Sequence, residues 1–237
     1  WYAIGTDGVP DAQTFDADVL IAHVPDFGAL GLGLLRQPKA VYFGPGQRSM
    51  LPSIVAPLGK RALICTDERM ATTPEFEAIR ASLVEAGISV DVFSQVEPDL
   101  PQSNVADLHG QFHDKDIQVV IGLGGGSCLD MSKMAGLLLH HGGDIRQYFG
   151  ENLVPGPGLP VITVPTTGGT GAEVSCISVV FDQEKGMKVG VASAYLEPHT
   201  AVVDPELTLT CPPGLTAATG ADALSHLIEC FTDRAKN

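Results

Sequence analysis

Residues 119–133, VVIGLGGGSCLDMSK, place three consecutive glycines between an apolar run and the start of a predicted helix. The β-branched apolar run is typical of a buried strand, and the glycines mark the turn that leads into the helix. Such a turn exposes backbone N–H groups at the positive end of the helix dipole, where an anion such as a phosphate binds. The alternative interpretation is a tight turn that lets the helix pack closely against the strand.

Two familiar phosphate-binding patterns do not match this turn. The pattern G-x-G-x-x-G requires glycine at position 127, where Ser127 stands, and the P-loop ends in Gly-Lys-Ser/Thr, where Cys-Leu-Asp stands. A second glycine-rich stretch, VPTTGGTGAE at 164–173, also follows an apolar run and adds the hydroxyls of Thr166, Thr167 and Thr170. We expect two such turns in one sheet to hold a dinucleotide from both sides.

Strand-like and helix-like segments alternate along the chain. Short β-branched and aromatic runs predict strands, and apolar residues at helical spacing predict the helices between them. The predicted strands lie within 39–46, 60–67, 89–96, 117–123 and 160–166, the predicted helices within 74–87, 105–115 and 132–141, and a hairpin within 176–193. This alternation permits parallel crossovers, so the sequence predicts an α/β fold: a Rossmann-like parallel sheet with helices on both faces.

Three regions are expected along the chain. They are an N-terminal extension over 1–35, an α/β dinucleotide-binding domain over 36–208, and the start of an all-α domain over 209–237. Beyond residue 208, Ala and Leu recur at helical spacing without a strand signal. Because the chain begins at Trp1 and its last helix stops without an ending signal, we expect a fragment in which the helical domain is truncated.

The composition limits the classes of partner. The chain has 237 residues, of which 44% are hydrophobic, and a formal net charge of −14 without a cluster of Lys and Arg, which argues against binding to nucleic acid or to anionic lipid. No run has the length of a transmembrane span. Five widely spaced cysteines without C-x-x-C indicate neither a disulfide framework nor a thiolate zinc site, so a cytoplasmic location is expected.

Two places offer acidic side chains for a ligand. Asp67 follows a predicted strand, at a place where a carboxylate accepts both ribose hydroxyls of an adenosine. Its charge would repel a 2′-phosphate, which favours NAD over NADP. An N-cap of the next helix is an equally good interpretation of Asp67.

Asp222 and His226 are four residues apart, so on a helix they share one face and suit Fe²⁺ or Zn²⁺. An ordinary surface pair is the alternative, and from spacing alone it is the better one.

Three long motifs, in order and at matching spacing, resemble those of the iron-containing (group III) alcohol dehydrogenase family. They are GGGSCLDMSK against the family's GGGSxxDxxK, VPTTGGTGAE against PTTxGTGxE, and DPELTLTCPPGLTAATGADALSHLIE against DPxL…P…TAxTGxDALxHxxE. The resemblance begins near Lys39 and runs to the end of the chain. It departs at V-E-P-D-L-P, where Asp99 stands in place of the Asn that the family often has in a V-x-P-N-P turn near the adenine.

The resemblance implies roles for particular residues. Asp222 and His226 are implied as the first two ligands of a catalytic Fe²⁺ or Zn²⁺, whose other two ligands are histidines on later helices. Contacts with NAD are implied for Asp67, Gly125, Gly126, Ser127, Thr166, Thr167, Ser175, Lys188 and Leu207. The implied activity is hydride transfer between a small alcohol or aldehyde and NAD, and a homodimer agrees with the resemblance.

Two alternatives stay open beside that activity. One is a metal-free reductase of the same superfamily that resembles maleylacetate reductase, although the D-A-L-S-H pair at 222–226 argues against it. The other is a module that binds NAD without turnover. Since 237 residues do not supply a full set of metal ligands, we expect the chain by itself to be inactive.

Overall fold

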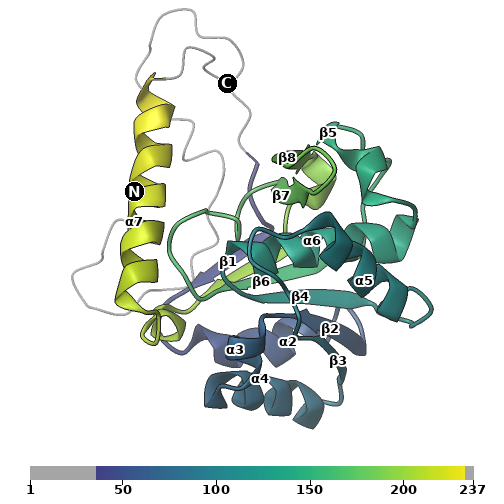
Figure 1. Cartoon of the computed structure of the whole chain (residues 1–237). Helices are drawn as coiled ribbons and strands as arrows, with labels where there is room; N and C mark the ends of the chain where they lie inside the picture. Colours follow the sequence, from purple (N-terminus) through teal and green to yellow (C-terminus); the bar gives the residue numbers. More distant parts are fainter. Residues whose placement is uncertain (1–35, 233–237) are drawn as a thin grey trace, which may run out of the picture. The chain divides into compact units, whose positions relative to one another are not determined.

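The computed structural model describes residues 36–232, and its centre is a six-stranded, fully parallel sheet with the strand order β1-β9-β6-β4-β2-β3 (Figure 1). Its strands are β1 (Ala40–Phe43), β2 (Arg61–Cys65), β3 (Ser89–Phe93), β4 (Val119–Gly124), β6 (Val161–Pro165) and β9 (Thr200–Val203). The predicted α/β parallel sheet is confirmed. The alternation did not predict β9, because its four residues TAVV are too short a run to show a period.

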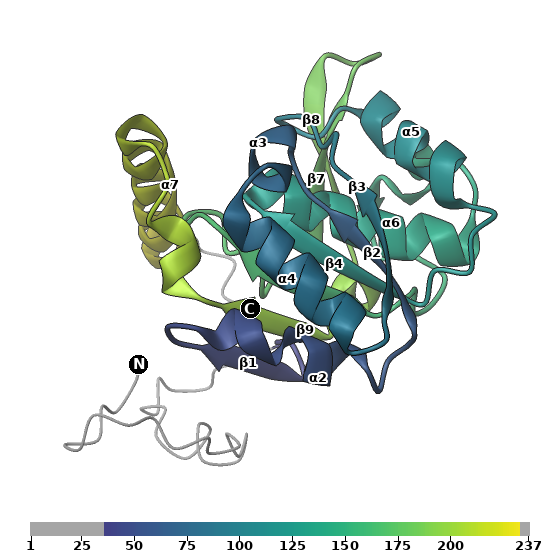
Figure 2. The same ribbon diagram turned by 90° about the horizontal axis from the view of Figure 1, so that it is seen from below.

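Helices cover both faces of this sheet, as parallel crossovers require. Helices α5 and α6 lie on one face and α2, α3 and α4 on the other, and Figure 2 views the second face with α4 in front of the strands. The α-helices of this part are α2 (Leu51–Val55), α3 (Glu68–Ala71), α4 (Pro74–Glu85), α5 (Gln102–Phe112) and α6 (Gly126–His141). Short 3₁₀ turns are η1 (Gln47–Met50), η2 (Ile145–Tyr148), η3 (Ala194–Leu196) and η4 (Pro205–Thr208).

Each face has its own hydrophobic core. Successive side chains of a strand point to opposite faces, so Leu63 and Cys65 join the core under α5 and α6, whereas Ala62 and Ile64 join the core under α2 and α4. All four side chains are fully buried. Strand β2 is therefore buried on both faces, which explains why its sequence reads as a continuous apolar run.

A smaller sheet adjoins the α6 side. Strands β7 (Ile177–Asp182) and β8 (Met187–Ala192) form an antiparallel hairpin, and the short strand β5 (Gly150–Glu151) pairs with β8. The predicted hairpin is confirmed, and it turns at Gly186, whose φ of 65° suits glycine. This hairpin carries Ser175 at its entrance and Lys188 in β8, two of the residues implied as cofactor contacts.

Helix α7 (Pro213–Thr232) follows η4 and is the last described element. The expected division near residue 208 stays a prediction, and the proposed N-terminal extension over 1–35 lies outside the described residues. Within residues 36–232, no helix combines the length and the apolar character that crossing a bilayer demands.

Candidate functional site

Strands β2 and β4 are neighbours in the sheet, yet the chain leaves their carboxyl ends toward opposite faces. After β2 it continues into α3 and α4, and after β4 into α6 on the other face. Such a divergence of adjacent crossovers opens a crevice at the carboxyl edge, which is where open α/β sheets bind ligands. Asp67 follows β2 and Gly125 follows β4, so the fold brings these two sequence-predicted residues to one crevice.

The glycine turn after β4 leaves the N-terminus of α6 uncapped by any side chain. Gly125 is the N-cap residue with extended backbone, and Gly124 has a φ of 149°, which is accessible to glycine. Within the described part of the chain, no protein acceptor meets the N–H groups of Gly126 and Ser127. These groups and the dipole of the 16-residue helix supply a site that suits a phosphate.

Packing also restricts two of these glycines. A Cβ at Gly124 would lie 2.6 Å from the Cys128 Sγ in the first turn of α6, so the tight-turn interpretation is correct at that position. A Cβ at Gly126 would lie 2.9 Å from the Thr170 Cγ2, so the Thr170 side chain would have to move. At Gly125 a Cβ would meet the Thr167 hydroxyl at an ordinary 3.5 Å, so packing does not explain the lack of a side chain there.

The threonine-rich turn after β6 lies against the glycine turn. The Thr166 N–H donates to the Gly124 carbonyl oxygen at 2.9 Å, and Thr167 and Thr170 face Gly125 and Gly126. Thr166 is buried, whereas Thr167 is half-buried. The two glycine-rich elements predicted to act together are thus in contact, as expected for neighbouring parallel strands.

Asp67 caps α3 with one carboxylate oxygen and turns the other toward the glycine turn. Its Oδ1 accepts the Met70 N–H at 2.7 Å, so the N-cap interpretation is correct. Its Oδ2 lies 3.9 Å from the Cys128 Sγ and 3.7 Å from the Cβ position of Gly124. Burial and the nearby Asp67 carboxylate raise the pKa of the Cys128 thiol to about 12, so this thiol stays protonated and donates toward Asp67.

Lys133, buried in α6, ties that helix to the hairpin that carries Ser175. The Lys133 side chain is fully buried, and its Nζ donates to the Ile177 carbonyl oxygen at 2.6 Å and to the Ser175 Oγ at 3.3 Å. Asp130 approaches the same Nζ at 3.6 Å and accepts the Val179 N–H at 3.0 Å. Burial lowers the pKa of Lys133 and raises that of Asp130, and the opposite charge of each opposes the shift of the other.

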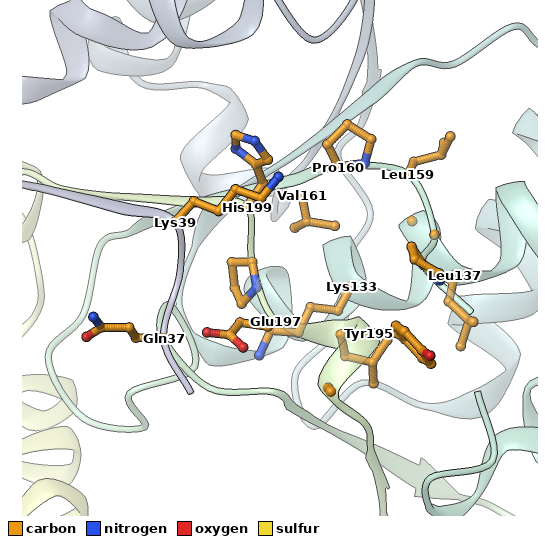
Figure 3. Close-up of a pocket in the computed structure, with 16 residues that line it drawn as sticks. Gln37, Lys39, Lys133, Leu137, Leu159, Pro160, Val161, Tyr195, Glu197 and His199 are labelled. Atoms are coloured by element: carbon orange, nitrogen blue, oxygen red, sulfur yellow. The ribbon is translucent and has the colours of Figure 1, made fainter. Parts of the chain in front are cut away.

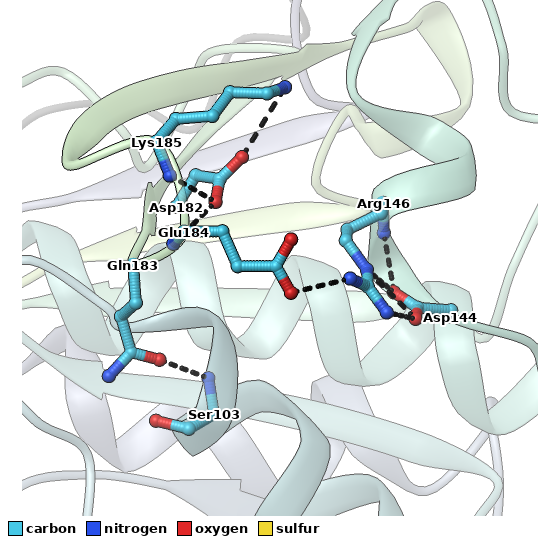
Figure 4. A network of polar contacts seen from close by, with 7 residues as sticks. All are labelled: Ser103, Asp144, Arg146, Asp182, Gln183, Glu184 and Lys185. Carbon is cyan, nitrogen blue, oxygen red and sulfur yellow. Dashed lines mark hydrogen bonds and ion pairs between the residues drawn. The ribbon is translucent and has the colours of Figure 1, made fainter.

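Polar contacts also hold the far end of the hairpin (Figure 4). Arg146 pairs with Glu184 at 2.8 Å, and the Gln183 Oε1 accepts the Ser103 N–H at 3.3 Å. Asp182 accepts the N–H groups of Glu184 and Lys185 inside the turn. The hairpin is therefore fixed at both ends, and Lys188 between them has a defined place.

Leu207, another residue implied as a cofactor contact, lies in η4 and is buried in the core of the α4 side.

Asp222 and His226 share one face of α7, as their spacing predicts. The His226 Nε2 lies 3.7 Å from the Asp222 Oδ1, and their side chains are 41% and 52% exposed for Asp222 and His226 respectively. One oxygen and one nitrogen donor fit Fe²⁺ or Zn²⁺ in kind, but residues 36–232 bring no group of three such donors together. A Cβ at Gly169 would lie 2.8 Å from the Thr219 side chain, so α7 touches the threonine-rich turn.

A cavity of about 410 Å³ opens at the opposite, amino-terminal edge of the sheet (Figure 3). It lies near the starts of β6 and β9 and is lined in part by Lys39, Glu197 and His199. Burial raises the pKa of Glu197, while burial and Lys39 lower that of His199. None of the residues expected to contact the cofactor or the metal lines this cavity, although Lys133, which donates to Ser175, does.

Sequence reasoning missed the supporting residues of this site. Asp130 and Lys133 stood in the quoted motif without a role, and their i,i+3 spacing was the available signal. Asp99, which departs from the family's motif, has its Oδ1 2.6 Å from the Lys188 Nζ. No pattern along the sequence indicates that contact, because it joins the loop after β3 to β8.

Comparisons with known proteins identify the family of this chain. Residues 38–205 match the family model described as "Iron-containing alcohol dehydrogenase". The chain is 39% identical over 173 residues to a sulfoacetaldehyde reductase of Bilophila wadsworthia, covering 73% of this chain and 45% of that protein. It is 36% identical over 195 residues to an NAD-dependent methanol dehydrogenase of Bacillus methanolicus, covering 82% of this chain and 51% of that protein.

A solved structure of a 1,3-propanediol oxidoreductase has the same fold. It superposes with a TM-score of 0.83 and 33% sequence identity, covering 87% of this chain and 55% of that one. The chain therefore spans about half the length of the relatives it matches. Since the family model covers more than half of these 237 residues, the chain belongs to the iron-containing alcohol dehydrogenase family.

Proposed function

We propose that the protein containing this chain is an NAD-dependent, divalent-metal-dependent dehydrogenase that transfers hydride between a small alcohol or aldehyde and the nicotinamide. The observation that carries the proposal is the crevice between β2 and β4. An uncapped helix N-terminus, a carboxylate from the neighbouring strand and a hydroxyl-rich turn converge there. This combination suits the diphosphate and the ribose of a dinucleotide.

Each part of the crevice has a separate task in this proposal. The N–H groups of Gly126 and Ser127 bind the diphosphate, and the bare Gly125 lets it approach the backbone. Asp67 accepts the ribose hydroxyls through the carboxylate oxygen that is not occupied by the α3 cap, and it repels a 2′-phosphate. Thr166, Thr167 and Ser175 line the side of the crevice toward the hairpin and orient the nicotinamide half.

Asp222 and His226 would hold the metal, Fe²⁺ or Zn²⁺, together with donors from outside residues 36–232. When bound, such an ion supplies Lewis-acid polarisation of the substrate oxygen. The exposed position of both side chains on α7 leaves them accessible to further ligands. Contact between α7 and the threonine-rich turn supports a position of the pair beside the cofactor crevice.

The names of the relatives support the reaction class and leave the substrate open. The methanol dehydrogenase is NAD-dependent by its description, and the sulfoacetaldehyde reductase acts on an aldehyde. Their substrates are small but differ in charge, so a short alcohol or aldehyde is the class proposed here.

The test is NAD⁺ reduction by a series of short primary alcohols and diols, measured on the whole gene product that contains this chain. The assay is run after treatment with a chelator and after addition of Fe²⁺ or Zn²⁺. The proposal predicts turnover that depends on one of the two metals. Turnover that survives the chelator would favour the metal-free reductase, and NADH binding without turnover under any condition would favour a cofactor-binding module.

A further inference from the structure

Asp99 and Lys188 form an ion pair between two elements that are distant in sequence. Asp99 lies in the loop after β3 and Lys188 in β8, and the carboxylate Oδ1 lies 2.6 Å from the ammonium Nζ. Their side chains are 63% and 57% exposed, so the pair faces solvent. Exposed ion pairs contribute little to the free energy of unfolding, so the main effect of this pair is on the local electrostatic potential.

The fold holds both partners in place. Asp99 and the following Leu100 have φ values of 63° and 50°, and the Leu100 side chain is fully buried. The Phe181 N–H donates to the Leu100 carbonyl oxygen at 2.9 Å, and Phe181 is the cross-strand partner of Lys188. The left-handed turn thus places the Asp99 carboxylate against β8 at the position of Lys188.

The same loop begins beside Asp67. The Val96 N–H donates to the Thr66 carbonyl oxygen at 3.1 Å, so the loop leaves β3 at the carboxyl edge next to the residue before Asp67. The loop that carries Asp99 therefore runs from the residue before Asp67 to β8. In the proposed function, Asp67 at the start of this loop receives the adenosine ribose.

We propose that Asp99 is a specificity-determining residue that disfavours NADP. By pairing with Lys188, it neutralises a cation that would otherwise attract a 2′-phosphate. The inference rests on the proposed dinucleotide site and names the cofactor class that this site selects. When Asp99 is replaced by a neutral residue, Lys188 loses its partner and its ammonium group becomes available to bind the 2′-phosphate.

The change Asp99→Asn removes the charge and leaves the shape of the turn, because asparagine adopts positive φ readily. One unit charge acting through water over about 4 Å corresponds to about a fivefold change in affinity. We therefore expect Asp99→Asn to lower the ratio of NADPH to NADH dissociation constants about fivefold at low ionic strength. Because the pair is exposed, added salt shrinks this shift.

The experiment measures both dissociation constants by quenching of intrinsic fluorescence, for the unaltered chain, Asp99→Asn and Asp99→Asn/Lys188→Met. The second variant is the matched control, since it removes the cation that the first one releases. The expected result is a shift in the ratio for Asp99→Asn that is lost in the double variant. A shift that persists without Lys188 would assign the phosphate to another cation, such as Arg69 in α3, two residues after Asp67, and would overturn the proposal.

An unchanged ratio in Asp99→Asn would also overturn the proposal, while leaving the proposed function intact. The two failures are distinguishable, because failure of the proposed function appears as no binding of either dinucleotide to the unaltered chain. Circular dichroism of both variants checks that the turn at Asp99 and Leu100 still folds. A folded variant with an unchanged ratio counts against the role of Asp99.

Discussion

The crevice at the β2–β4 edge and the Asp222–His226 pair on α7 carry the two halves of the proposed chemistry, and they are built differently. At the crevice, buried contacts fix each element: Lys133 is fully buried and joins α6 to the hairpin. On α7, both candidate ligands are about half exposed, and so are the apolar side chains of Leu224, Leu227 and Ile228. The proposed cofactor half is thus preorganised by the described residues, whereas the proposed metal half would need additional donors.

The difference shows which function each region can have alone. Residues 36–232 contain the strands, turns and supporting pairs of the proposed dinucleotide crevice. On α7 they contain two donors and no third one nearby. We therefore expect substitutions in the ligand-facing turns of the crevice to affect cofactor binding, substitutions in its buried supporting pairs to affect folding as well, and substitutions on α7 to affect activity with little effect on folding.

The largest expected effect is on activity. Asp222→Ala in the whole gene product should remove the metal and reduce alcohol oxidation to the background of the assay, while NADH affinity stays. Metal content by plasma spectrometry and NADH titration are measured on the same preparation. Full metal content in Asp222→Ala would contradict the assignment of the pair.

A second contrast concerns the reactivity of thiols in the two regions. Because burial raises the pKa of Cys128 to about 12, its thiolate is scarce at neutral pH, whereas Cys230 on α7 is exposed. We expect iodoacetamide to label Cys128 at least about a thousandfold more slowly than Cys230. Mass spectrometry of the labelled peptides gives both rates, and comparable rates would mean that the glycine turn opens readily.

Lys133→Met tests whether the buried tie between α6 and the hairpin stabilises the crevice. Removing one partner of a buried ion pair leaves the other charge uncompensated, so the free energy of unfolding should fall by about 3 kcal/mol. Lys115→Met is the matched control, because Lys115 pairs with Asp91 at 3.0 Å but is 35% exposed, and it should cost less than about 1 kcal/mol. Urea unfolding measures both, and equal losses would refute the distinction.

Gly125→Ala tests the effect of a side chain on NADH affinity separately from its effect on folding. The backbone of Gly125 has a φ of −76°, and a Cβ there meets only an ordinary contact, so the fold should tolerate alanine. The methyl group would stand between the diphosphate and the backbone, and NADH affinity should fall at least about tenfold, or about 1.4 kcal/mol. Gly110→Ala, in α5 with open space around it, should leave affinity intact.

The smallest effect is expected from Asp222→Asn on stability. An exposed i,i+4 pair contributes less than about 0.5 kcal/mol, so the free energy of unfolding of the chain should hardly change. A loss above about 1 kcal/mol, twice the upper end for such pairs, would show that Asp222 is engaged in packing and would weaken the contrast between the regions.

Much of the fold follows from local patterns, as particular elements illustrate. The run RALIC is apolar enough to predict β2, and PEFEAIRASLVE has the apolar spacing and the N-terminal proline that predict α4. Helix α3 was missed because four residues show less than two turns of periodicity. The position of Asp67 in the sequence fits either an N-cap or a ribose ligand. Only the fold shows that one carboxylate oxygen accepts the Met70 N–H while the other faces the glycine turn.

The arrangement of the site could not be predicted in the same way. The crevice exists because β4 returns to the other side of β2 after β3, and strand order is not encoded in the period of any one segment. The contacts of Lys133 with Ser175, and of Asp99 with Lys188, join residues 42 and 89 positions apart. Such pairs depend on long-range packing, which a local pattern cannot specify.

The most direct test is a crystal structure of the chain with NADH bound. Density for the diphosphate is expected at the N–H groups of Gly126 and Ser127, with the adenosine ribose against Asp67. Density at the cavity near Lys39 and His199, or an empty glycine turn in the presence of saturating NADH, would contradict this placement of the cofactor.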